Sequence, residues 1–173
     1  DGQPSSTSTE HLTLSVDANV SEIDATYDVS LIRGVTEDHP PQLEATFTNK
    51  SDSRRTFRFE SDAPLSPMAN TASNPMLHLR TPPSNGTYEE DGCWRAASSG
   101  WLSDATIATL APDEHVSNRL DVLAAPNTDG ERYCLPKGEF AFTTTVPAYE
   151  GSTEGEQGDK VGEDTLQFTL TIT

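Results

Sequence analysis

Residues 43–59 read LEATFTNKSDSRRTFRF, and this stretch decides the fold class. Apolar and polar side chains alternate over 43–48 and again over 56–59, and the segment 49–53 between them is entirely polar. A period of two is typical of β-strands that bury one face, because successive side chains point to opposite sides of the strand. The stretch therefore predicts two strands joined by a polar turn, in the form of a β-hairpin.

The same alternation recurs along the rest of the chain and predicts strands over 12–16, 27–31, 116–122, 140–146 and 166–172. A further short strand is expected within 103–110, because β-branched Thr106, Ile107 and Thr109 favour an extended backbone. No stretch offers a comparable helical stripe. The pattern predicts an all-β protein, built as an antiparallel β-sandwich with long loop insertions.

At 173 residues the chain has the length of one domain. Residues 1–10 are expected to form a polar N-terminal segment, typical of a tether at the start of an exported protein. Residues 11–173 then form a single β-sandwich domain. Two loop insertions are expected within it, a proline-rich one at about 63–92, with a possible short strand over 76–80, and a Gly- and Glu-rich one at about 147–164.

The chain is strongly acidic, with a formal net charge of −17, and its only lysines are Lys50, Lys137 and Lys160. A phosphate-bearing partner needs clustered Lys and Arg, so this composition argues against nucleic-acid binding. The acidic residues are spread along the whole sequence. Such a distribution is typical of a surface adapted to concentrated salt, where the Debye length falls to about 3 Å and repulsion is screened. An ordinary acidic secreted protein is the alternative.

Cys93 and Cys134 are the only cysteines, and they lack the C-x-x-C spacing of a redox or metal pair. In an exported protein such a pair most often forms a disulfide, which is the prediction here. Asn19, Asn49 and Asn85 each begin an Asn-x-Ser/Thr tripeptide and are candidate glycosylation sites.

The two tryptophans admit two interpretations. Trp94 is expected to pack in the core beside the disulfide, as a tryptophan commonly does in a sandwich. Exposed at the surface, Trp94 or Trp101 would instead join the two long loops as binding candidates.

Several turns resemble those of immunoglobulin-like domains in secreted prokaryotic proteins. The segment 46–52 followed by 57–59 looks like their extended strand, Asn-x-Ser turn and apolar strand, and 110–114 and 135–142 look like their later proline-led and glycine-led turns. The similarity covers about residues 41–146. It extends distantly to the bacterial intracellular proteinase-inhibitor domain and to haloarchaeal surface lipoproteins. The resemblance implies an immunoglobulin-like sandwich and carries over no reactive-site residue.

The sequence contains no pattern that specifies a catalytic reaction. The four histidines have neither i, i+4 nor H-E-x-x-H spacing, and no G-x-S-x-G elbow, P-loop or G-x-G-x-x-G motif is present. The acidic segments 89–92 and 127–131 offer oxygen atoms for Ca²⁺ without the ligand spacing of an EF-hand, and are expected to be solvated turns. We expect no enzyme activity, no cofactor and no bound metal.

The function expected from these features is that of a non-catalytic extracellular cell-surface protein, structural or adhesive. Leu12, Leu14 and Val16 are candidates for strand addition, either completing the sheet of a neighbouring copy in a filament or pairing within their own domain. The alternative is a monomeric binding or protease-inhibitor module. The expected partner is a protein, including another copy of the chain. No run of residues is apolar enough to span a bilayer, and a lipid anchor preceding Asp1 is left open.

Overall fold

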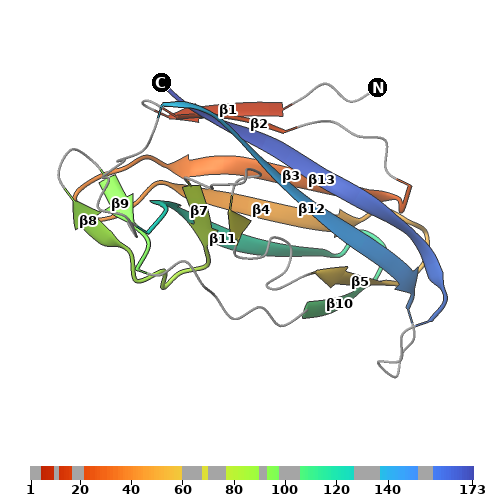
Figure 1. The fold of residues 1–173 in the computed structure, drawn as a ribbon. Coiled ribbons are helices and arrows are strands. Elements are labelled where there is room, and N and C mark those ends of the chain that lie inside the picture. Colours follow the sequence, from red (N-terminus) through yellow and green to blue (C-terminus); the bar gives the residue numbers. More distant parts are fainter. Residues whose placement is uncertain are drawn as a thin grey trace.

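The computed structural model describes residues 5–9, 12–16, 22–59, 68–69, 77–89, 93–97, 106–126, 137–151 and 158–173. All regular elements in these ranges are β-strands, and they form two sheets that face each other (Figure 1). The prediction of an all-β, two-sheet protein is confirmed. Every strand predicted from alternation is present, and so is the short strand expected within 103–110.

The first sheet has six strands in the order β1-β2-β13-β12-β5-β10. Every neighbouring pair in it is antiparallel. The two longest strands, β12 and β13, form the centre, and the strands near the N-terminus extend the sheet beyond β13. The bounds are β1 (Ser5–Thr9), β2 (Leu12–Val16), β13 (Lys160–Ile172), β12 (Gly138–Glu150), β5 (Arg55–Phe59) and β10 (Thr106–Leu110).

The second sheet has seven strands, five of them in the order β3-β4-β11-β7-β6. The remaining two, β8 and β9, form an antiparallel pair that joins β11 through a single parallel contact between Arg95 and Ala124. The bounds are β3 (Ala25–Arg33), β4 (Gln42–Asn49), β11 (His115–Ala124), β7 (Leu77–Arg80), β6 (Met68–Ala69), β8 (Thr87–Glu89) and β9 (Cys93–Arg95).

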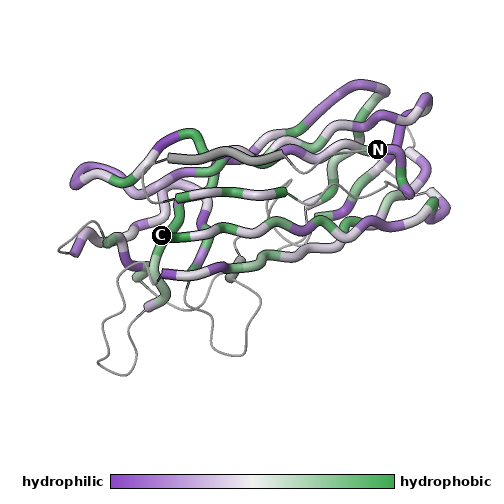
Figure 2. Tube along the Cα trace, turned by 90° about the horizontal axis from the view of Figure 1, so that it is seen from above, coloured by the Kyte–Doolittle hydropathy of each residue, from purple (hydrophilic) through white to green (hydrophobic). Residues whose placement is uncertain are grey.

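The core lies between the sheets and is filled by the apolar side chains of the alternating positions. Hydrophobic and hydrophilic residues alternate along the strands in Figure 2, as the sequence pattern requires. Two clusters of buried residues each draw on both sheets. One contains Phe142 stacked on Phe168, with ring centroids 5.1 Å apart, and the other contains Phe47 and Phe57. Each such side chain stabilises the fold by about 1.5–3 kcal/mol through burial.

The stretch 43–59 forms two strands but no hairpin. β4 pairs with β3 and β11 in one sheet, whereas β5 pairs with β12 and β10 in the other, so the turn carries the chain from one sheet to the opposite one. The reason lies in the interior: the ring of Phe47 meets Phe57 and Phe59 edge to face, at centroid distances of 4.8 and 5.3 Å. The aromatic side chains face each other across the core instead of lying side by side on one sheet.

The insertions also differ from the sequence-based expectation. The segment 63–92 contributes β7, as expected, together with β6 and β8. In the segment 147–164, β12 continues to Glu150 and β13 begins at Lys160, with Pro147 opposite Glu163, so that the connection is shorter than predicted. Within the segment 1–10 that the sequence predicts to be a polar tether, residues 5–9 form β1 and belong to the six-stranded sheet.

Candidate functional site

The predicted strand-addition residues lie inside the molecule. β2 pairs antiparallel with β13 of the same chain, and Leu14 lies opposite Leu170. Leu12, Leu14 and Val16 are all buried in the core. The sequence left two alternatives for this strand, which are addition to the sheet of a neighbouring copy and pairing within its own domain. In the structure the strand pairs within its own domain. Since β2 has β1 on one side and β13 on the other, the N-terminal strand at the margin of the sheet is β1.

Asn49 is a structural residue that holds the turn between the sheets. Its side chain is fully buried, and its amide nitrogen donates hydrogen bonds to the carbonyl oxygens of Ser53 at 3.0 Å and Leu110 at 2.9 Å. Its amide oxygen accepts bonds from the backbone N–H and the hydroxyl of Ser51. A glycan would be attached to this same nitrogen, so the prediction of a glycosylation site at Asn49 is incompatible with the folded structure.

The other two candidate glycosylation sites differ from Asn49. Asn85 is exposed in the connection between β7 and β8, and its φ of 54° lies in the left-handed region that asparagine tolerates. Asn85 therefore stays a candidate. Asn19 lies outside the described residues.

A buried carboxylate ties together the end of the sandwich where β3 and β4 are connected. Asp121 on β11 accepts hydrogen bonds from Gln42 Nε2 at 2.8 Å and from Ser84 Oγ at 2.7 Å. The guanidinium of Arg33 lies 3.8 Å from the same carboxylate. These three partners compensate the burial of the Asp121 carboxylate and hold their chain segments against β11. The carboxylate therefore has a structural role.

Sequence reasoning missed this network, although one signal was present. Asp121 interrupts the apolar run 120–124, whose members are all buried. An acidic residue inside such a run requires a polar partner.

His78 and Arg80 lie on β7 at the same end of the molecule. Burial lowers the pKa of His78 to about 4, and the positive charge of Arg80 acts in the same direction. His78 Nδ1 lies 3.0 Å from Arg80 Nη2, which donates to the unprotonated ring nitrogen. Burial also lowers the pKa of Arg80. The pair thus depends on a neutral imidazole.

Trp94 is not the core residue that the sequence predicts. It is half-buried, lies opposite Tyr88 in the β8–β9 pair with ring centroids 5.6 Å apart, and donates from Nε1 to the carbonyl oxygen of Thr36 at 2.8 Å. Its neighbour Arg95 turns inward and binds Glu89 at 2.8 Å. Alternation along β9 therefore places Cys93 and Arg95 inside and the indole toward the surface. Trp101 lies outside the described residues.

Cys93 is fully buried at the start of β9, and the residues that the structure describes include no free cysteine. Cys134 lies outside the described residues. The pairing of Cys93 with Cys134 stays a prediction.

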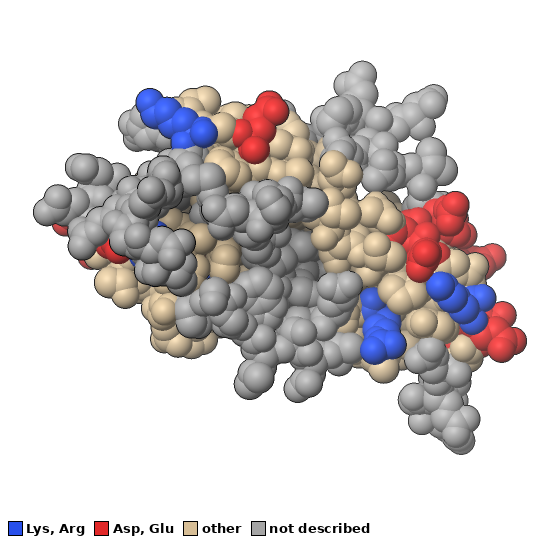
Figure 3. Space-filling view, viewed as in Figure 1, with Lys and Arg blue, Asp and Glu red and all other residues tan. Residues whose placement is uncertain are grey.

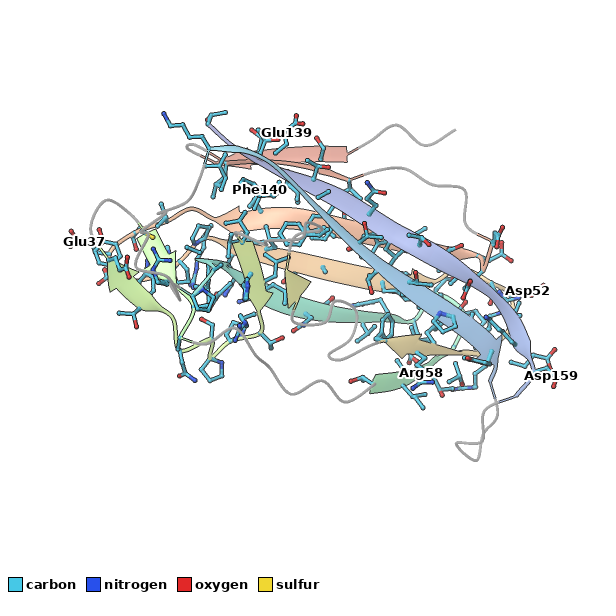
Figure 4. The ribbon with its side chains drawn as sticks, viewed as in Figure 1. Glu37, Asp52, Arg58, Glu139, Phe140 and Asp159 are labelled. Carbon is cyan, nitrogen blue, oxygen red and sulfur yellow. The ribbon has the colours of Figure 1, made fainter. Side chains whose placement is uncertain are left out.

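Charged side chains gather at the ends of the sandwich. In Figure 3 the acidic residues cluster near the end where Figure 4 labels Asp52 and Asp159, and Figure 4 labels Glu37 at the opposite end, beside β8 and β9. The three lysines are exposed, and two of them form surface ion pairs, Lys50 with Asp113 and Lys160 with Glu163, each at 3.2 Å. Exposed pairs of this kind contribute less than about 1 kcal/mol each.

Within the described ranges, no three His, Cys, Asp or Glu side chains gather in a group suited to a metal ion. His39, His78 and His115 belong to different segments, and His11 lies outside the described part of the chain. The acidic segment 127–131 lies outside it as well. Within 89–92 only Glu89 is described, and it binds Arg95.

Comparison with protein-family models, curated proteins and solved structures finds no significant match to this chain. Among the described residues, no helix is long and apolar enough to cross a membrane. The fold and the two candidate places, the N-terminal strands and the loop end with Trp94, are therefore what a functional proposal rests on.

Proposed function

We propose that this chain is a non-catalytic extracellular cell-surface protein with a structural or adhesive role, and that it assembles into filaments through its N-terminal strands. The observation that carries the proposal is the position of the N-terminal hairpin. β1 and β2 extend the six-stranded sheet beyond β13, and β2 supplies three core side chains. A chain that completes a sheet by adding strands at its margin uses the same backbone pairing by which subunits join in strand-addition assemblies.

We further propose that the sandwich is immunoglobulin-like. The support is that the chain passes from one sheet to the other at several points, for example between β4 and β5 and again between β10 and β11. Such crossing is typical of that class of sandwich.

Electron microscopy of native protein in molar NaCl tests the filament proposal. The decisive variant lacks residues 1–9, because this deletion removes β1 and leaves the core residues of β2 in place. A longer deletion that includes β2 would remove Leu12, Leu14 and Val16 and would confound assembly with unfolding. We expect filaments from the native chain and monomers from the truncated one. Native protein that stays monomeric at all concentrations would refute the proposal.

An exported, brine-adapted protein is the setting that we propose for this function. The net charge of −17 and the scarcity of lysine support it. Molar salt screens repulsion among the carboxylates, so the melting temperature should rise as NaCl increases towards molar concentration. A melting temperature that does not rise with salt would rule this setting out.

Intact mass before and after alkylation, with and without reductant, tests the disulfide of Cys93 and Cys134.

A monomeric binding or protease-inhibitor module is the second candidate function. The observation that favours a binding role is the half-buried Trp94, whose indole is oriented by its hydrogen bond to Thr36. A partly exposed aromatic side chain held in one orientation is a common anchor in protein recognition. An inhibitor would bind a protease at a one-to-one ratio as a monomer, which titration against a panel of proteases measures.

A further inference from the structure

The two margins of the six-stranded sheet share a property that is unusual in this protein. β1 (SSTST) and β10 (TIATL) are both five residues long, and neither contains a charged residue, a proline or a glycine. The chain as a whole has 28 acidic and 11 basic residues. Edge strands normally carry charges, prolines or bulges, because an unprotected edge pairs with other chains.

The second sheet provides the comparison within the same molecule. Its margin strand β3 contains Asp28 and Arg33 and has a register irregularity between Leu31 and Arg33. Its other margin strands, β6 and β8, have only two and three residues. Charges, a bulge and a very short strand are the devices that prevent edge pairing. The second sheet thus has protected margins, whereas the six-stranded sheet does not.

The direction of the strands makes the two unprotected margins complementary. All neighbouring strands of the six-stranded sheet are antiparallel, so β1 and β10, the first and the last of six, run in opposite directions. A second copy placed beside the sheet in the same orientation would therefore set its β1 antiparallel to β10, which continues the alternation of the sheet. The two strands lie at opposite margins of the molecule (Figure 1).

The surroundings of the two strands agree with this arrangement. β3 of the second sheet packs against both strands of the N-terminal hairpin, β1 and β2. On β10, Ile107 is the most exposed large apolar side chain in the described part of the protein, at 57%. It lies opposite Arg58 of β5, which Figure 4 labels beside β10. In the described ranges no further strand pairs with β1 or β10.

We propose that β1 of one copy pairs antiparallel with β10 of the next, so that the six-stranded sheets of successive copies form one continuous sheet. The partner of this surface is a second copy of the chain, and the contact is head to tail. Such a contact produces a filament when the rotation between successive copies does not close a ring. Each step between strands rotates a sheet by about 20–25°, so the copies are related by a screw and the filament is helical. This inference rests on the proposed filament function and identifies the strand that receives the N-terminus.

The test uses the full chain with one margin blocked at a time. Ile107→Glu places a carboxylate on β10 opposite Arg58, where it keeps a favourable cross-strand partner within its own sheet. The double variant Ser6→Glu/Ser8→Glu blocks β1 at positions paired with Ser15 and Thr13 instead of the buried residues of β2. Val161→Glu is the matched control, because Val161 is also an exposed apolar residue but belongs to β13, which is neither of the two strands in the proposed contact.

We expect each blocked variant to raise the protein concentration needed for assembly at least about tenfold, which corresponds to a loss of about 1.4 kcal/mol per contact. The control should assemble like the native chain. Thermal melts at concentrations below the assembly threshold, where the native chain and the variants are all monomeric, should coincide and so exclude unfolding as the cause. In a mixture of the two blocked variants, the open β10 of one should bind the open β1 of the other, and sedimentation should show a one-to-one dimer that grows no further.

The outcomes separate this inference from the filament function. Filaments that form equally well from both blocked variants would overturn the β1–β10 contact and leave the filament function standing. A dimer formed by one blocked variant alone would show pairing of like margins and would also overturn it. A native chain that never assembles would refute the filament function and this contact together.

Discussion

Replacement of Asn49 by Asp tests whether the turn between the two sheets depends on buried hydrogen bonds. The substitution keeps the shape of the side chain and both bonds that its oxygen accepts from Ser51. It removes the two bonds that the amide nitrogen donates to Ser53 and Leu110, and it places a carboxylate oxygen against their carbonyl oxygens. The site is fully buried, so water cannot replace the lost donors.

The magnitude follows from these contacts. Two neutral hydrogen bonds contribute about 1 kcal/mol each, and a buried carbonyl left without a donor costs about 1–3 kcal/mol. The free energy of unfolding should therefore fall by about 3–5 kcal/mol, a large share of the roughly 5–15 kcal/mol that stabilises a domain. Urea denaturation, followed by circular dichroism in the same molar salt for all variants, measures this difference.

Asn85→Asp is the matched control for this experiment. Asn85 is exposed and has a left-handed φ that aspartate also tolerates, so its replacement should change stability by less than about 0.5 kcal/mol. If the Asn49→Asp variant lost less than about 1 kcal/mol of its free energy of unfolding, the turn would not depend on the buried amide. The structural role assigned to Asn49 would then be wrong.

Three further predictions each concern a single side chain that packs in the interior. Leu14→Ala should lower the free energy of unfolding by about 2–5 kcal/mol, because Leu14 is fully buried in the core; a loss below 1 kcal/mol in urea denaturation would mean that β2 does not stay docked. Tyr27→Phe should leave stability unchanged or raise it by up to about 1 kcal/mol, because the buried hydroxyl has no hydrogen-bond partner in the described structure; a loss above 1 kcal/mol would reveal a partner. The pKa of His78 is lowered from 6.5 to about 4, so between these pH values the unfolded chain binds a proton that the folded chain does not. The contribution of His78 to the free energy of unfolding is therefore complete above pH 6.5 and is lost as the pH falls towards 4. The loss is at most about 3 kcal/mol. The His78→Gln variant should lack this component, which urea melts from pH 7 to pH 4 would measure against the native chain; identical pH dependence of the two proteins would contradict it.

Strand identity could be predicted from the sequence because alternation depends only on neighbours along the chain. Leu166, Phe168 and Leu170 are buried in the structure at the positions that the pattern gives. The two-sheet architecture follows from the same signal, since an apolar strand face must be covered. Pairing could not be predicted in this way. The alternation of 43–48 and 56–59 fits a hairpin and a crossing between sheets equally well, and distant strands decide between them.

The candidate site was only partly predictable for a related reason. The buried state of Asn49 depends on the carbonyl of Leu110, 61 residues away, and its sequence context is the same Asn-x-Ser/Thr pattern that marks exposed Asn85. Trp94 faces outward because the residues on either side of it, Cys93 and Arg95, face inward, a choice of strand face that local sequence leaves open.

The sequence by itself determined the acidic character of the chain, the positions of its strands with alternating apolar and polar residues and which side chains of those strands are apolar, because these properties reside in residues and their spacing. Only the tertiary structure decided that β2 fills its own core, that the turn at Asn49 joins two sheets, and that β1 and β10 are the margins of one sheet. These features depend on which strands pair across long separations, and the pairing is selected by the fit of side chains such as Phe47 and Phe57 across the interior.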